Sequence, residues 1–287
     1  MWNYRGLELS NGMLCVLISH PSIDMAAAAL DISIGSLADP RDVTGIAHFL
    51  EHMLFMGSTK YPGENEYSKL VQSNGGACNA YTSGNRTNYY FDIHPSLLSD
   101  ALDVFAHFFI SPLLSPSSIG RELQAVHSEF ESYLGQDSWR IFQVDKLTSD
   151  PEHPYSRFTI GNMESLRTTS NLCGTDIRQV LIDFYENEYS ANRMSLAVLG
   201  NQSLDELQSF VVRSFKNVPN KQLITQQYPA DPVGETRRKN SLYQKLQSLV
   251  LADGEYYELV RSNFERADHQ SDVHVMTMFF FFHIQLI

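Results

Sequence analysis

The stretch from Gly45 to Met56 reads GIAHFLEHMLFM and decides how the rest of the chain is interpreted. It contains few residues that break a helix, and its apolar residues recur at helical spacing. Thr44 is the predicted N-cap, and Gly57 is the residue predicted to end the helix. The sequence therefore predicts an amphipathic helix whose polar positions include two histidines and one glutamate.

The polar positions of this helix have the spacing of a metal site. His48 and His52 are four residues apart, so on a helix they lie on one face, about 40° from each other. Neutral imidazoles bind Zn²⁺ at about 2.0–2.1 Å, and a catalytic zinc site has three protein ligands and one position open to water. Glu51 lies beside the histidines, where a carboxylate can take a proton from such a water.

A third ligand is available on a second predicted helix. Residues 121–130 read RELQAVHSEF, in which Glu122 and Glu129 are seven positions apart and therefore share one helical face. One of these carboxylates would complete the metal site, and the other would hold a ligating imidazole in orientation. The chemistry of the residues does not choose between Glu122 and Glu129 as the ligand.

Two runs of sequence resemble the pitrilysin family of zinc metallopeptidases. They are residues 45–79, GIAHFLEHMLFMGSTKYPGENEYSKLVQSNGGACN, and residues 121–129, RELQAVHSE. The resemblance extends roughly from Tyr4 to Val218. It implies one zinc ion per chain, and it assigns Glu129, 77 residues after His52, as the glutamate ligand. It further implies that His48 and His52 are the other ligands, that Glu51 is the general base and that Glu122 is the outer-shell carboxylate.

The resemblance also implies a strand that binds substrate. Residues 75–82, GGACNAYT, match the strand on the substrate side of the family's metal site. The edge of a sheet can pair with an extended peptide through backbone hydrogen bonds, whatever the peptide's side chains. Asn79, Ala80 and Tyr81 are the candidate substrate-binding residues. Without the metal motif, the same strand would be interpreted as part of an ordinary hairpin.

The wider pattern predicts an α+β fold, with helices packed on one face of a mostly antiparallel sheet, together with an incomplete second domain. Trp139 and Phe142, nearly one turn apart, are predicted to be core residues. The predicted strands are 13–19, 26–34, 79–82, 87–93 and 194–200. The predicted helices are 45–56, 65–72, 95–109, 117–134, 139–146, 175–189 and 203–215, the last with Ser203 as its N-cap, and 151–172 is predicted to be a loop.

The chain changes character after residue 220. The predicted organisation is a catalytic domain at 1–220, a polar linker at 221–240 and a fragment of a second domain or an unrelated tail at 241–287. The last fragment is predicted to hold a helix at 241–264 and a buried apolar strand at 273–287. That apolar end, with roughly 13 apolar positions, is shorter than the ~20 residues that a membrane-spanning helix needs.

The net charge and the cysteine content indicate which partners and which location to expect. The net charge is −12, whereas proteins that bind nucleic acid or anionic membranes present cationic surfaces, so neither partner is expected. Cys15, Cys78 and Cys173 form no C-x-x-C pair, and three reduced thiols are expected. The segment 1–10 has no apolar stretch of the kind found in secretion signals, so a cytoplasmic location is expected.

Two functions follow from the predicted site. The first is a zinc-dependent endopeptidase that hydrolyses small or unfolded peptides; the intact Glu51 favours it. The second is a non-catalytic paralogue that binds zinc and peptides or pairs with a full-length relative. The resemblance implies long family members with two halves that close around the substrate. A second half-chain or a homodimer is therefore the expected partner, besides the peptide substrates.

Overall fold

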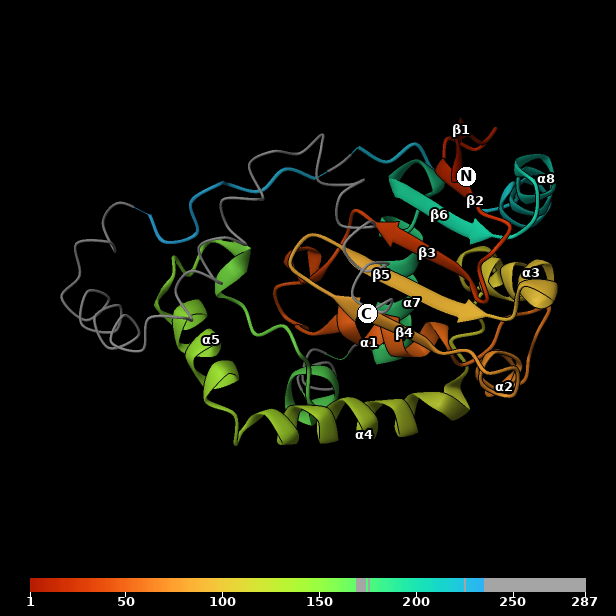
Figure 1. Cartoon of the computed structure of the whole chain (residues 1–287). Coiled ribbons are helices and arrows are strands. Elements are labelled where there is room, and N and C mark those ends of the chain that lie inside the picture. The colour runs from red at the N-terminus through yellow and green to blue at the C-terminus, as the bar shows by residue number, and fades with distance from the viewer. Residues whose placement is uncertain (169–173, 175, 225, 235–287) are drawn as a thin grey trace. The chain divides into compact units, whose positions relative to one another are not determined.

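The computed structural model describes residues 1–168, 174, 176–224 and 226–234 (Figure 1). The chain divides into two compact units. The first consists of Met1–Arg140 and Arg157–Gln226, and the second of Ile141–Ser156 and Gln227–Ile287. The helix predicted at 241–264, the strand predicted at 273–287 and Cys173 lie outside the described residues. Cys15 and Cys78 are free thiols, as the sequence predicts.

One sheet forms the centre of the first unit. Its strands run in the order β1-β2-β6-β3-β5-β4 (Figure 1). β2 and β6 are parallel and every other neighbouring pair is antiparallel. The predicted mostly antiparallel sheet is therefore confirmed. The strand bounds are β1 Asn3–Glu8, β2 Leu14–Ser19, β3 Ala26–Ile32, β4 Cys78–Thr82, β5 Thr87–Ile93 and β6 Met194–Gly200.

The first strand is absent from the sequence prediction. β1 lies at one edge of the sheet, pairs only with β2 among the described strands, and has no fully buried residue. Its sequence, NYRGLE, contains neither an apolar run nor strict alternation, which are the signals by which strands are recognised. The hydrogen bonds of β2 and the turn at Asn11-Gly12 form this strand, since Gly12 takes a φ of 80° that suits glycine.

The helices match the predicted ones to within a few residues at each end. Pro95–Leu97 forms a separate 3₁₀ turn before α3, and Ser203 caps α8 in a reciprocal capping box with Glu206. The loop predicted at 151–172 is wrong in part, because it contains a 3₁₀ turn at Pro154–Ser156 and a π-helix at Met163–Thr168. The helices are α1 Ile46–Leu54, α2 Glu66–Gln72, α3 Leu98–Ile110, α4 Pro116–Tyr133, α5 Asp137–Thr148, α7 Ile177–Glu188 and α8 Leu204–Phe215.

Helices α1, α2, α3, α7 and α8 lie on one face of the sheet and bury an aromatic core, whereas α4 packs against α1 (Figure 1). Tyr67 of α2 makes an edge contact with Phe108 of α3, with ring centroids 4.8 Å apart, and Phe105 contacts Phe91 of β5 at 5.3 Å. Burial of each phenylalanine ring contributes about 1.5–3 kcal/mol. This core holds α1, the helix that carries His48 and His52, beside β4, the candidate substrate strand at the edge of the sheet.

The described part of the second unit is small. Lys146 is buried and donates to the backbone oxygen of Tyr155 at 2.9 Å, and its ammonium lies over the rings of Tyr155 and Phe142. His153 Nε2 contacts the backbone oxygen of Pro229 at 2.9 Å. Across the described residues of both units, no helix combines the length and apolarity needed to cross a bilayer.

Candidate metal centre

The N-terminus of α1 is capped by a side chain that the sequence prediction did not include. Gly45 has φ 92° and ψ 8°, a left-handed conformation that glycine adopts without a steric penalty. Asp39 accepts hydrogen bonds from the backbone N–H of Gly45 at 2.6 Å and of Ala47 at 2.9 Å. The prediction of Thr44 as N-cap is therefore wrong, because the chain returns Asp39 to the first turn and its carboxylate satisfies the free N–H groups there.

A close backbone approach fixes the first histidine. A Cβ on Gly45 would lie 2.3 Å from the Cα of Gly161, so only glycine lets the two segments meet. Their contact places the carbonyl of Ile160 at 2.6 Å from Nδ1 of His48. Because a carbonyl only accepts, Nδ1 carries the proton and the lone pair of a neutral ring is on Nε2.

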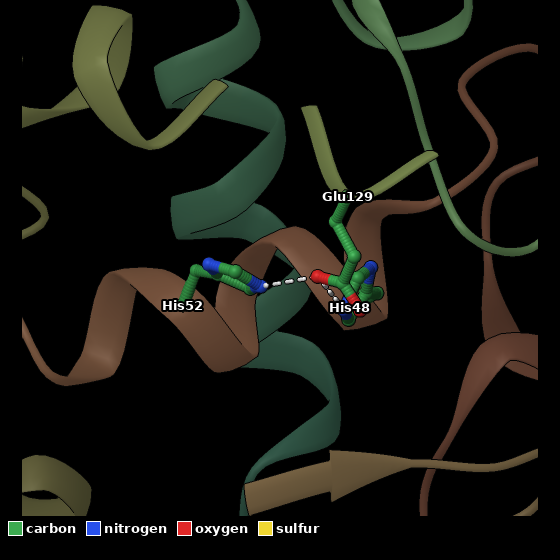
Figure 2. Close-up of side chains that lie close together, drawn as sticks. All are labelled: His48, His52 and Glu129. Atoms are coloured by element: carbon green, nitrogen blue, oxygen red, sulfur yellow. Dashed lines mark ion pairs between the residues drawn. The ribbon is translucent and has the colours of Figure 1, made fainter. Parts of the chain in front are cut away.

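Three side chains converge from two helices. In Figure 2, Glu129 of α4 points between His48 and His52 of α1. Its Oε2 lies 3.5 Å from His48 Nε2 and 3.4 Å from His52 Nε2. One ligand atom from each residue lies within 4.8 Å of the other two, so the three residues could hold a metal ion. The two imidazole rings meet nearly edge-on, with centroids 4.9 Å apart.

The two glutamates of α4 contact different atoms. Glu129 is near both Nε2 atoms, whereas Oε2 of Glu122 lies 3.5 Å from Nδ1 of His52, on the far side of that ring. The structure thus brings both predicted carboxylates to the histidines. It separates them by position, one on the side where the ligand atoms converge and one behind a ring.

The cluster has a strong affinity for positive charge. Burial alone would lower the pKa of His52, but the bonds to Glu122 and Glu129 outweigh it and raise that pKa to about 9. Reciprocally, the hydrogen bond from His52 lowers the pKa of Glu129 to about 2, against the effect of burial. A proton shared with an anion occupies the place that a cation could take.

Glu51 is buried next to this cluster. Only 7% of the residue is exposed, and Thr82 of β4 donates to its Oε2 at 2.5 Å. Burial raises the pKa of Glu51 above its usual range, while His48 and the Thr82 hydroxyl oppose that shift. The carboxylate is therefore held by one hydrogen bond in a site where it binds a proton more readily than in water.

The candidate substrate strand is the sheet edge opposite β1. Asn79 is exposed, and Ala80 and Tyr81 are half-buried. The backbone N–H of Ala80 donates to Oδ1 of Asn79 at 2.9 Å, so a side chain of the strand itself occupies this donor. Gly76, just before the strand, is required, because a Cβ there would lie 2.1 Å from the backbone oxygen of Asp92.

The contacts of Trp139 contradict its predicted core position. It is half-buried, and its ring stacks on Tyr133 with centroids 4.2 Å apart and an angle of 20°. Phe142 is also half-buried and belongs to the second unit, where it contacts Tyr155. The prediction that both belong to the core is wrong, because a partly polar helix presents them to other aromatic side chains near the surface.

Sequence reasoning also missed two side chains that hold the carboxylates, Thr82 and Tyr133. Thr82 contacts Glu51 from another element of the fold, and no local pattern indicates such a contact. Tyr133 stands four residues after Glu129 and donates to its Oε1 at 2.5 Å. The four-residue spacing on a helix could have indicated this pair.

Comparison of the sequence with known proteins shows the family of the chain. Residues 14–152 match "Insulinase (Peptidase family M16)", and residues 176–254 match "Peptidase M16 inactive domain". The human insulin-degrading enzyme is 48% identical over 236 residues, which are 82% of this chain and 23% of that protein. The chain belongs to peptidase family M16. An M16 relative from Arabidopsis thaliana, "Insulin-degrading enzyme-like 1, peroxisomal", is 45% identical over 80% of this chain.

Solved structures agree with the M16 assignment. Pitrilysin matches with a TM-score of 0.78 and 36% identity, over 82% of this chain and 25% of that chain. The first half of the Escherichia coli periplasmic protease PqqL shares the fold, with a TM-score of 0.67 and 24% identity. The chain spans about a quarter of the length of the curated M16 relatives described above, 23% of the human protein.

Proposed function

We propose that residues 1–220 form the catalytic domain of a zinc endopeptidase that hydrolyses small or unfolded peptides. The observation that carries the proposal is the convergence of His48 Nε2, His52 Nε2 and Glu129 Oε2 beside the buried carboxylate of Glu51. Two imidazoles and one carboxylate are the donor set of a catalytic zinc site, so these residues fit one zinc ion per chain.

Glu51 is the proposed general base. When bound by these residues, zinc would supply a water whose pKa is lowered to about 7 and would polarise the carbonyl of the scissile bond. Glu51 would accept the water's proton on its carboxylate as the water oxygen bonds to the scissile carbon, and would pass it to the amine nitrogen as the C–N bond breaks. Thr82 keeps the carboxylate aimed during both transfers, and burial raises its affinity for the proton that it carries.

The outer contacts support this assignment of ligands. Glu122 lies behind His52 at Nδ1, and the carbonyl of Ile160 lies behind His48 at Nδ1. Partners at the second ring nitrogen fix the tautomer and the orientation of a ligating histidine. We assign Glu122 this orienting role and Glu129 the role of ligand.

Peptide substrates are proposed to pair with β4. Asn79, Ala80 and Tyr81 belong to β4, the edge strand of the sheet among the described residues, and an extended peptide would add to this edge as a further strand. Because Asn79 occupies the N–H of Ala80, the peptide must displace that side chain, which then becomes available to the substrate.

The proposal includes a partner and a location. Residues 221–240 are proposed to link the domain to a further one that starts within 241–287. The relatives are about four times as long, so we propose that a second half-chain or a second copy provides the remaining contacts with the substrate. With a net charge of −12, nucleic acid and anionic membranes are not proposed as partners, and the proposed location is the cytoplasm.

The test is zinc content together with cleavage of a quenched fluorescent peptide, on the same purified 287-residue chain. One zinc per chain and cleavage that a chelator abolishes are expected. Glu51→Gln should keep the zinc and lose at least the 10²–10⁴-fold that acid–base catalysis typically contributes. Retained cleavage in Glu51→Gln would show that Glu51 is not the general base. Zinc binding without cleavage in the wild type would mean that activity requires the proposed second half-chain or second copy.

A second pair of variants tests the assignment of the ligand. Glu122→Gln should weaken zinc binding by the roughly 10–100-fold typical of an outer-shell partner. Glu129→Gln should weaken it further, because one of three protein ligands is lost. Equilibrium titration against a zinc-binding dye measures both, and the opposite order exchanges the two roles.

A further inference from the structure

The two carboxylate oxygens of Glu129 have different partners. Oε2 faces Nε2 of His48 and of His52, whereas Oε1 accepts the hydroxyl hydrogen of Tyr133 at 2.5 Å. A free carboxylate can bind a metal ion through one oxygen or through both. The hydroxyl contact breaks this symmetry, since it engages one oxygen and leaves the other for an ion.

Tyr133 is held in place from two sides. It stands four residues after Glu129, in the last turn of α4, so helix geometry places its side chain beside the carboxylate. Its ring stacks on Trp139 at the start of α5, with centroids 4.2 Å apart and an angle of 20°. A stacked aromatic pair is more stable than its buried area alone would make it, so the contact favours one position of the hydroxyl.

We propose that Tyr133 is a positioning residue that keeps Glu129 a one-oxygen ligand, with Trp139 holding the tyrosine ring. This inference rests on the proposed zinc site. It adds a function that the M16 motif does not include, because Tyr133 and Trp139 lie after the motif residues in the chain.

The contact of Tyr133 with Glu129 would keep one coordination position of the proposed zinc ion open. Two imidazoles and one carboxylate oxygen leave a fourth position for water, whereas a second oxygen of Glu129 beside that water would raise the coordination number to five. With Tyr133, each of the three ligand side chains has a partner away from the ion: Ile160 for His48, Glu122 for His52 and Tyr133 for Glu129. Outer-shell partners of this kind tune affinity and orientation.

The test is Tyr133→Phe in the full 287-residue chain, which removes one oxygen atom from a half-buried ring. Tyr61→Phe is the matched control, because its hydroxyl also donates to a carboxylate, that of Asp103, among residues outside the zinc cluster. Each variant is loaded with Co²⁺ for visible absorption and with Zn²⁺ for X-ray absorption. Circular dichroism checks that each is folded.

In Tyr133→Phe we expect one additional oxygen neighbour around zinc and weaker d–d absorption of Co²⁺, because both oxygens of Glu129 then reach the ion. Zinc should also bind about tenfold more weakly, at the low end for an outer-shell partner. Tyr61→Phe should match the wild type in every readout. An unchanged coordination number and spectrum in Tyr133→Phe overturn the proposal, whatever the affinity.

The stacking contact is tested by two changes at Trp139. Trp139→Phe retains an aromatic face and should give the wild-type spectrum, whereas Trp139→Leu should shift the spectrum towards that of Tyr133→Phe. A wild-type spectrum in Trp139→Leu overturns the role given to Trp139. If the wild-type chain itself takes up no metal, the proposed zinc site fails. If it takes up metal and Tyr133→Phe leaves the coordination unchanged, the inference alone fails.

Discussion

The two helices that carry the candidate metal ligands, α1 and α4, differ sharply in burial. Seven of the nine residues of α1 are buried, whereas only Ser118, Leu123 and Val126 are buried among the 18 residues of α4. Both helices contribute side chains to the same cluster. One side of the site is therefore part of the hydrophobic core, and the other is a largely exposed helix.

This difference shows how each helix is positioned. α1 is fixed by the close packing of its seven buried residues, which tolerates few changes of volume. α4 is attached through the buried Leu123 and Val126 and through polar side chains: Ser118 donates to Glu64 at 2.6 Å, Arg121 pairs with Glu64, and Glu122 lies 3.5 Å from His52. The histidines are thus positioned by the packing of α1, and the glutamates depend more on local contacts of α4.

The largest expected effect separates the two helices by stability. Phe49 of α1 is fully buried, and Phe49→Ala should cost about 3–5 kcal/mol of unfolding free energy through lost contacts and a cavity. Gln124→Ala, at an exposed position of α4, should change it by about 0.5 kcal/mol or less. Denaturant unfolding monitored by circular dichroism measures both. Equal losses would contradict the contrast between the helices.

A smaller effect concerns the ion. Because zinc would bridge α1 and α4, its addition should slow amide hydrogen exchange in α4 far more than in α1, which packing already protects. At a free zinc concentration of 100 times Kd, the stabilisation is about 2.7 kcal/mol. Exchange measured by mass spectrometry, with Glu129→Gln as control, tests this. Equal slowing in both helices would mean that α4 is held as firmly as α1.

The smallest effect concerns the polar attachment of α4. The side chains of Arg121 and Glu64 are 55% and 36% exposed, so Arg121→Met should lower the unfolding free energy only slightly, and less at high salt. Arg140→Met is the control, because Arg140 pairs with the more exposed Asp137. Denaturant unfolding at low and high salt measures both. A loss that salt does not change would show that Arg121 acts through packing rather than charge.

Much of the fold could be predicted from local pattern. The spans of β5 and β6 were predicted to the residue, and Ser203 was correctly predicted as the N-cap of α8. Elements without a local pattern were missed. β1 forms because it pairs with β2, and the first turn of α1 is capped by the carboxylate of Asp39, which stands five residues before the expected cap, Thr44.

The sequence by itself determined which side chains share a face. Four-residue spacing aligns His48 with His52, and seven-residue spacing aligns Glu122 with Glu129, because helix geometry is local. Only the tertiary structure decided which partner each face meets. It set Glu129 at both Nε2 atoms, Glu122 behind one ring and Thr82 on Glu51, because the packing of α1, α4 and β4 depends on contacts between distant parts of the chain.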